Sequence, residues 1–347
     1  MIVKPATNHF NPAGPRQGKW LTWGRREPVV RMKQRSGTKY TYGPVPSRRL
    51  GKSLGVSIIP RKTCTNSCVY CQLGRTRVTH IHPRSFFPRD EVFAEVERVM
   101  KETSPDCITF VGDGEPTLSA DLGWFIRKCK MRWPIPVAVI TNGCLLFLEE
   151  TREDLRQADI VLPSLDAGDA VTFRAINRPH PSLEFNRVVE GLIAFRVSFR
   201  GVMRLEVMLV KGMNDHEASL RSIRKLAWAI KPDRIDVAVP MRPPAERWVL
   251  PPDPADLILA QRLFRSAETL DRPETGTFEV AGFHSLVDAI VGLSSRHPLR
   301  WDQAKQLEKA FGQPDRLELL VQEGVIASVE YEGKRFVAPI TRQKPRH

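Results

Sequence analysis

The stretch "KTCTNSCVYCQLGR" (residues 62–75) places three cysteines, Cys64, Cys68 and Cys71, within eight residues. Clustered thiols in a chain with only six cysteines are more typical of a metal site than of a disulfide framework. A structural zinc site takes four protein ligands, and no fourth cysteine follows nearby. A [4Fe–4S] cluster held by three thiolates keeps one iron open for a small molecule. The spacing therefore favours such a cluster, with a truncated zinc knuckle or a chance grouping as the alternatives.

Short β-rich runs alternate with helical runs from residue 54 onward. Strands are expected at residues 54–60, 107–112, 137–143, 159–166, 204–215 and 233–240, and helices at residues 89–102, 121–131, 149–158, 182–196 and 217–230. Strands that alternate with helices of this length imply parallel pairing through right-handed crossovers. The pattern predicts an α/β fold, either a partial (β/α)6 TIM-like barrel or a doubly wound open sheet.

With Tyr70 directly before Cys71, the cysteine spacing resembles the signature of the radical S-adenosylmethionine superfamily. The resemblance implies a [4Fe–4S] cluster on Cys64, Cys68 and Cys71, whose open iron is chelated by the amino and carboxylate groups of S-adenosylmethionine. In that superfamily an electron from the reduced cluster cleaves the sulfonium C–S bond, and the 5′-deoxyadenosyl radical abstracts hydrogen from a substrate. An electron donor such as ferredoxin or flavodoxin is implied as well.

A second motif, "GDGEPT" (residues 112–117), follows the second expected strand. It is similar to the Gly-Gly-Glu element of the superfamily, whose backbone meets the amino group of the bound methionine. The resemblance makes Gly112, Asp113, Gly114 and Glu115 cofactor-binding candidates, although Asp113 stands where the first glycine is usual. An acidic turn is the plainer interpretation of the same residues.

Chemistry in parallel α/β sheets lies at the carboxyl ends of the strands, where further polar residues occur. The cofactor candidates there are Tyr70, Asn142, Ser164, Asp166, Asn214 and the backbone at Val239. By the resemblance, Ser164 and Asp166 hydrogen-bond the carboxylate or the ribose hydroxyls of S-adenosylmethionine, and the backbone at Val239 flanks the adenine. Arg242 is expected to project into the mouth, as a candidate to bind an acidic substrate group. Each of these side chains is also an ordinary polar group at a strand end.

The resemblance narrows further with "YGPVPSRRLGKSLGV" (residues 42–56), "QLGRT", "GDGEPTL" and "RPPAE". Over about residues 40–250 these segments look like a subgroup that is often grouped with the wyosine-synthesising tRNA enzymes. Those enzymes carry an additional upstream cysteine set, whereas no cysteine precedes Cys64 here. Wyosine synthesis itself is therefore not expected, and RNA, a peptide and a small metabolite all stay open as substrates. Arg48 and Arg49 either contact substrate phosphates or close the bottom of the barrel.

The last sixty residues have a winged-helix pattern. Helices are expected at residues 284–296, 301–311 and 314–324, and a hairpin at 325–339 with Glu332 and Gly333 at its turn. The expected recognition helix has an acidic excess, so DNA binding is not expected and docking to substrate or protein is favoured. The predicted domains are a basic arm (1–39), a radical S-adenosylmethionine core (40–245), a proline-rich connector with a helix at 255–270 (246–282) and a winged-helix-like domain (283–341).

The charge of the chain is unevenly distributed. The formal net charge is +14, and residues 1–50 hold eleven basic side chains against Glu27 alone. A basic arm favours anionic partners. Two other interpretations are that the arm is only a solubilising tail, and that the natural protein starts at Met32. Neither a long apolar run nor a secretory signal occurs, so no membrane span and a cytoplasmic location are expected. Two other functions compete with an enzyme: an iron–sulfur sensor or nucleic-acid-binding regulator, and a zinc-binding interaction module.

Overall fold

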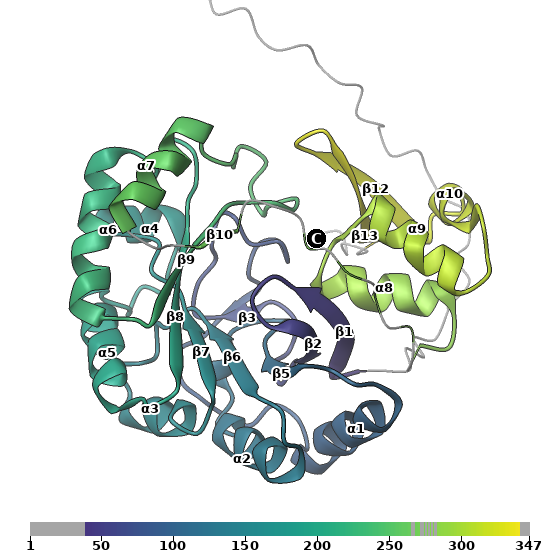
Figure 1. Cartoon of the computed structure of the whole chain (residues 1–347), viewed down its shortest axis with the longest axis horizontal. Coiled ribbons are helices and arrows are strands. Elements are labelled where there is room, and N and C mark those ends of the chain that lie inside the picture. The colour runs from purple at the N-terminus through teal and green to yellow at the C-terminus, as the bar shows by residue number, and fades with distance from the viewer. Residues whose placement is uncertain are drawn as a thin grey trace, which may run out of the picture. The chain divides into compact units, whose positions relative to one another are not determined.

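The computed structural model describes residues 39–264, 268–270 and 283–340, and singly Glu274, Gly276, Phe278 and Val280. Its main feature is an eight-stranded sheet in the order β1-β2-β5-β6-β7-β8-β9-β10 (Figure 1). The strands are β1 (Thr41–Ser47), β2 (Gly51–Val56), β5 (Cys107–Phe110), β6 (Val137–Thr141), β7 (Ile160–Pro163), β8 (Val202–Met208), β9 (Arg234–Ala238) and β10 (Glu268–Leu270). From β2 to β10 every neighbouring pair is parallel, which confirms the predicted parallel sheet.

The strands follow one another in chain order, without the reversal that defines a doubly wound sheet. The doubly wound alternative is therefore wrong. The turn between β1 and β2 reaches the other end of the strand order, where Arg49 pairs with Glu206 on β8 and Arg48 donates to the carbonyl of Leu270 on β10. The sheet is thus curled so far that side chains from the turn after its first strand, β1, contact β8 and its last strand, β10.

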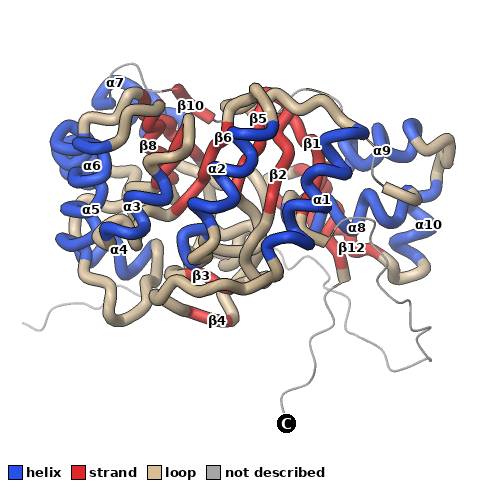
Figure 2. The backbone as a smooth tube through the Cα atoms, turned by 90° about the horizontal axis from the view of Figure 1, so that it is seen from below, coloured by secondary structure: helices blue, strands red, loops and turns tan. Residues whose placement is uncertain are grey.

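Amphipathic helices connect the parallel strands and lie along the outer side of the curled sheet (Figures 1 and 2). They are α1 (Arg89–Glu102), α2 (Leu122–Arg132), α3 (Glu149–Leu155), α4 (Ala170–Ile176), α5 (Phe185–Ser198), α6 (Glu217–Ile230) and α7 (Pro254–Phe264). In α1 the buried side chains are Val92, Val96 and Val99, which form one apolar stripe against the sheet. A 3₁₀ turn, η1 (Pro116–Leu118), follows β5, and a small pair, β3 (Thr63–Cys64) with β4 (Val78–Thr79), forms a separate sheet. No helix in the described part of the chain is long and apolar enough to cross a membrane.

The edges of the sheet differ from the sequence prediction. The helix expected at residues 255–270 ends at Phe264, because Glu268–Leu270 pair with Asp236–Ala238 as strand β10. The antiparallel strand β1 was not predicted, and the first parallel strand runs from Gly51 to Val56 rather than over residues 54–60. Most of the basic arm, including Met32, lies outside the described residues.

The C-terminal segment has its own small sheet and apolar core. Its elements are α8 (Leu286–Arg296), β11 (Leu299–Arg300), α9 (Trp301–Ala310), α10 (Arg316–Gln322), β12 (Ile326–Tyr331) and β13 (Lys334–Pro339). The predicted helices and hairpin are present. Glu332 and Gly333 form the turn of the hairpin, with φ angles of 48° and 66°. Strand β11, which the sequence analysis missed, pairs with β13. Tyr42 and Val45 of β1 join the apolar core of this segment, so the segment packs on the edge of the large sheet.

Candidate active site

The three clustered cysteines lie in the long loop that follows β2. Cys64, Cys68 and Cys71 are free thiols and partly exposed. Backbone bonds shape the loop, since the amide of Cys71 donates to the carbonyl of Cys68 at 3.2 Å. The amide of Val69 donates to the carbonyl of Ile176 at 2.9 Å, which ties the loop to the end of α4. The strand ends and α4 therefore hold the thiols in one place.

Two asparagines from neighbouring segments donate to these thiols. Asn142, after β6, lies 3.5 Å from the sulfur of Cys64 through Nδ2. Asn177, after α4, lies 3.6 Å from the sulfur of Cys68 through Nδ2. Such N–H···S bonds stabilise a thiolate ligand more than a neutral thiol.

Burial raises the pKa of all three thiols. The nearby carboxylates of Glu115 and Asp166 raise the pKa of Cys64 and Cys68 further. A thiolate is therefore expensive at this position unless a metal supplies positive charge, so the donor set fits an iron–sulfur cluster. Within the described ranges, no three His, Cys, Asp or Glu side chains converge on a single metal-ion position. A [4Fe–4S] cluster does not need that convergence, because each thiolate binds a different iron.

The "GDGEPT" loop lies directly against the cysteine loop. The amide of Glu115 donates to the carbonyl of Thr63 at 3.1 Å, and Gly114 has no room for a side chain because a Cβ would lie 1.8 Å from that carbonyl oxygen. Gly112 has a φ angle of 129°, which favours glycine. Glycines at 112 and 114 are thus needed for the backbone conformation and for the close contact.

Glu115 turns inward rather than toward the cavity. Its buried carboxylate accepts from the hydroxyl of Thr141 at 2.6 Å and from the amide of Asn142 at 2.7 Å, and also from the amide and hydroxyl of Thr117. Burial raises the pKa of Glu115, and these four bonds oppose that rise. The carboxylate therefore joins the ends of β5 and β6 and sets the position of Asn142.

Asp113 pairs with a residue that the sequence analysis did not find. Its carboxylate lies 2.9 Å from Arg296 at the end of α8, and both side chains are about one-tenth exposed. Arg296 also donates to the carbonyl of Lys39 at 2.8 Å, and Gln72 of the cysteine loop donates to the carbonyl of Arg296 at 3.1 Å. The C-terminal segment thus contacts both loops of the site. No local motif marks Arg296, because its partner lies 183 residues earlier in the chain.

Asp166 is the centre of a second buried network. Its carboxylate accepts from the hydroxyl of Tyr70 at 2.5 Å, from Asn177 at 2.6 Å and from the amide of Met208 at 2.9 Å. Burial raises the pKa of Asp166 to about 6, although these bonds lower it. Asn214 is fully buried, and its amide group bonds the backbone of Asp166, Met208 and Val210. Both side chains therefore fix the ends of β7 and β8 around the cysteine loop.

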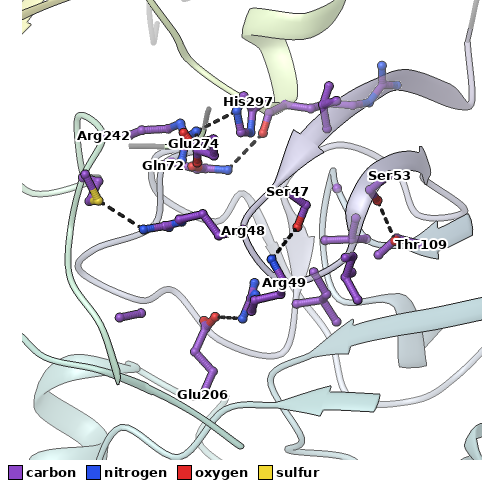
Figure 3. A pocket seen from close by; sticks show the side chains of 18 of the residues that line it. Ser47, Arg48, Arg49, Ser53, Gln72, Thr109, Glu206, Arg242, Glu274 and His297 are labelled. Atoms are coloured by element: carbon purple, nitrogen blue, oxygen red, sulfur yellow. Dashed lines mark hydrogen bonds and ion pairs between the residues drawn. The ribbon is translucent and has the colours of Figure 1, made fainter. Parts of the chain in front are cut away.

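A cavity of about 310 Å³ opens beside these loops. Cys71, Gly112 and Val239 line it together with the three predicted arginines. Figure 3 labels these arginines, Arg48, Arg49 and Arg242. The lining residues that the sequence analysis missed include Glu206, Glu274 and His297, none of which lies in a recognisable motif. Ser164 lies apart from them, in a narrow pocket that Asn142 and Asp166 also line.

Comparison with known proteins gives matches over most of the chain. The model of the radical SAM superfamily matches residues 58–222. A UPF0026 protein of Methanocaldococcus jannaschii is 35% identical over 303 residues, which cover 85% of this chain and 94% of that protein. A protein of Brachyspira hyodysenteriae named GTPase Obg is 43% identical over 246 residues, or 70% of this chain, and the match spans only 36% of that protein. The solved structure of TYW1 with a lysine-pyruvate adduct bound matches 62% of this chain and 74% of its own at 15% identity, with a TM-score of 0.47.

Proposed function

The chain belongs to the UPF0026 family and to the radical S-adenosylmethionine superfamily, and from this premise we propose that it cleaves S-adenosylmethionine reductively and abstracts hydrogen from a substrate in the adjoining cavity. Superfamily members are iron–sulfur enzymes that use a [4Fe–4S] cluster, S-adenosylmethionine and an external reductant. When bound to the three cysteines, such a cluster would supply the electron for this cleavage. The observation that carries the proposal is that Cys71 and Gly112 line the same cavity as Arg48, Arg49 and Arg242.

In this proposal the three cysteines hold the cluster and the surrounding polar groups hold the cysteines. Asn142 and Asn177 donate to the sulfurs of Cys64 and Cys68. Tyr70 stays in place through its bond to Asp166. These contacts would keep the loop in one conformation when the cluster changes its charge.

The same geometry suggests how the cofactor residues divide their roles. The backbone at Gly112, Asp113 and Gly114 would meet the amino group of S-adenosylmethionine, and the backbone at Val239 would flank the adenine. Ser164 keeps its proposed contact with the carboxylate or ribose. Glu115, Asp166 and Asn214 would act as positioning residues, because protein donors and acceptors already occupy their polar atoms.

We also propose how the chain is divided into domains and which partner supplies the electron. Residues 40–245 would form a partial (β/α)6 barrel, 246–282 a connector whose helix α7 and strand β10 continue the same sheet, and 283–341 a winged-helix-like domain. We propose that this last domain covers the site rather than binding DNA, because the arginines of its helix α10 and its hairpin already have acidic partners: Arg316 pairs with Glu323 at 2.8 Å and Arg335 with Glu318 at 2.7 Å. A ferredoxin or flavodoxin would supply the electron, in the cytoplasm.

The test is anaerobic reconstitution with iron and sulfide, followed by reduction and measurement of 5′-deoxyadenosine. We expect product from the natural protein and none from Cys68→Ala. Cys129→Ala is the matched control, because Cys129 is buried in α2 away from the loop and its thiol has no proposed role. An intact cluster without cleavage, with or without candidate substrates, would favour the iron–sulfur sensor. Stoichiometric zinc without iron would show instead that the cysteines belong to a zinc-binding module.

A further inference from the structure

The loop that carries the three cysteines has charge of one sign. From residue 57 to residue 88 the chain contains no Asp or Glu. The basic side chains of the same stretch are Arg61, Lys62, Arg75, Arg77 and Arg84. A surface with charge of one sign attracts partners of the opposite sign, provided that carboxylates from other segments leave that charge in place.

Carboxylates from other segments offset part of this charge. The carboxylate of Glu246 lies 2.8 Å from Arg75 and 2.5 Å from Arg178, so one negative charge serves two arginines. Asp113 forms its ion pair with Arg296, at 2.9 Å. These contacts account for Arg75 and Arg296, and they leave other cations of the loop to be explained.

Lys62 and Arg77 have no carboxylate within 4 Å in the part of the chain that the structure describes. The buried carboxylates near the thiols, Glu115 and Asp166, accept from protein donors instead. Lys62 and Arg77 are direct neighbours, because the amide of Arg77 donates to the carbonyl of Lys62 at 2.9 Å. Two positive charges therefore lie together without compensation.

Lys62 places its charge beside the third cysteine. A Cβ on Gly74 would lie 3.1 Å from Nζ of Lys62, and the amide of Gly74 donates to the carbonyl of Cys71 at 2.9 Å. Lys62 has a φ angle of 62°, a left-handed conformation that favours glycine. The backbone therefore gives no reason for a lysine at this position.

Arg61 adds a third positive charge. Its guanidinium donates to the carbonyl of Ser295 at 3.0 Å. Burial lowers the pKa of Arg61, the charge of Asp113 opposes that change, and the charges of Arg296 and Arg77 lower the pKa further. Arg61 is therefore close enough to Arg77 for the two charges to repel. We call Arg61, Lys62 and Arg77 the basic rim of the cysteine loop.

The basic rim lies on an exposed edge of the molecule. Strands β3 and β4, which carry or adjoin it, lie at the lower margin of the view in Figure 2. Val78 of β4 is 48% exposed, so an apolar side chain stands among the cations. An apolar centre within a charged surround is typical of a protein-docking surface. Single-stranded nucleic acid is held by stacking on aromatic rings, and Tyr70, the one Phe, Trp or Tyr in residues 61–79, is bonded to Asp166.

We propose that the basic rim docks the external reductant, a small electron-transfer protein with an acidic surface around its redox centre. This inference rests on the proposed function, because a cluster on the three cysteines is what needs an electron at this place. The partner would lose one electron and the cluster would gain it, so no further reactant is required. Cys64, Cys68 and Cys71 are partly exposed, so a protein on the rim lies close to the thiols. Redox partners bury little surface and depend on complementary charge, which the rim supplies.

Binding of acidic redox proteins tests the inference. The anaerobically reconstituted protein is titrated calorimetrically with a flavodoxin and, separately, with a [2Fe–2S] ferredoxin, both chosen for acidic isoelectric points. We expect saturable binding of at least one of them at low salt, with a Kd that rises steeply toward an ionic strength of about 0.15 M because salt screens the charges. The double variant Lys62→Gln, Arg77→Gln should raise the Kd at low salt about tenfold or more.

A double variant on α6, Arg221→Gln with Lys225→Gln, is the matched control. Both side chains are exposed, so the variant loses the same charge at a distant place and should keep the Kd. Lys62→Arg with Arg77→Lys preserves the charge of the rim and should also keep the Kd. Arg61 is left unchanged, because its substitution would remove the bond to Ser295. Iron analysis and circular dichroism check that each variant holds its cluster and its fold.

Three results would overturn the inference. The first is no saturable binding of either redox protein, or an equal Kd in all variants. The second is an unchanged Kd with a lower iron content, which would show that the rim only stabilises the thiolates. The third is binding of tRNA, but of neither redox protein, that the rim variant loses.

A second measurement separates this inference from the proposed function. Photoreduced deazariboflavin is a small reductant that needs no docking surface. Formation of 5′-deoxyadenosine with deazariboflavin, without binding of either redox protein, would refute the docking surface alone. Binding at the rim without any 5′-deoxyadenosine would refute the proposed cleavage alone.

Discussion

Gly114 gives the sharpest stability prediction, because Gly114→Ala forces two backbones apart. The new Cβ would lie 1.8 Å from the carbonyl oxygen of Thr63, 2.9 Å from its carbonyl carbon and 2.8 Å from a methyl group of Ile59. A carbonyl oxygen cannot rotate away as a side chain can. Thr63 must therefore shift by more than an ångström before the contact is tolerable.

The cost has two parts. Overpacking of a buried contact costs about 1–3 kcal/mol. The shift also breaks the bond from the amide of Glu115 to the carbonyl of Thr63, now 3.1 Å long, for about another 1 kcal/mol. We expect the free energy of unfolding to fall by about 2–4 kcal/mol in total. Because Cys64 follows Thr63 directly, the content of bound iron should fall as well.

Urea unfolding of the iron-free protein, followed by circular dichroism, measures the first effect, and iron analysis after reconstitution measures the second. Gly212→Ala is the control, because Gly212 has a φ angle of 72° but no atom within 4 Å of a new Cβ. It should lose only about 1–2 kcal/mol of left-handed strain and keep its iron. If Gly114→Ala were as stable as the natural protein and bound a full complement of iron, the close contact would not exist in solution.

Three further predictions test other contacts of the site. In a double-mutant cycle of Asp113→Ala and Arg296→Met, urea unfolding should give a coupling energy of about 1.5–3 kcal/mol, and additive losses would exclude the ion pair. His297 has a folded pKa below its unfolded value of 6.5, so it binds fewer protons when folded and its stabilising effect is lost as the pH falls from 6.5 toward 3. His297→Gln should therefore reduce the acid loss of stability between pH 6.5 and 5 by at most about 1.4 kcal/mol per pH unit, and unchanged pH curves would refute an imidazole that stays neutral in the folded protein. Asn177→Ala should make the reduction potential of the cluster more negative in a redox titration followed by electron paramagnetic resonance, since it removes a donor to Cys68; a potential equal to that of the natural protein would show that the bond is absent when iron is bound.

The regular elements follow closely from sequence patterns where one apolar stripe decides the structure. Helices α1 and α6 have the bounds that the spacing of their apolar residues predicts, residues 89–102 and 217–230. Strand β10 was missed because residues 268–270 continue a helical pattern. Pairing with β9 decides their conformation, and a partner 32 residues away leaves no local signal.

The site residues that lie in local motifs were predictable from the sequence, and the contacts that depend on distant partners were not. The cysteine loop and "GDGEPT" are local patterns, and both lie in the candidate site. The inward direction of Glu115 was not predictable, because it depends on where β6 places Thr141 and Asn142. Polar residues at strand ends are ambiguous for the same reason: the motif gives their place in the sheet, and the neighbouring strands decide whether they face a ligand or the backbone.

Asp113 shows what a departure from a family pattern can mean. It stands where a glycine is usual, and in isolation it would put a buried negative charge beside the cysteine loop, where Glu115 and Asp166 already raise the pKa of the thiols. Arg296 removes that cost, because its guanidinium lies 2.9 Å from the Asp113 carboxylate and its backbone carbonyl accepts from Gln72 of the loop. An aspartate at this position is therefore favourable only while α8 is in place. The departure in the motif and the C-terminal segment are parts of one arrangement, and truncation before α8 should destabilise the cysteine loop as well as remove the segment.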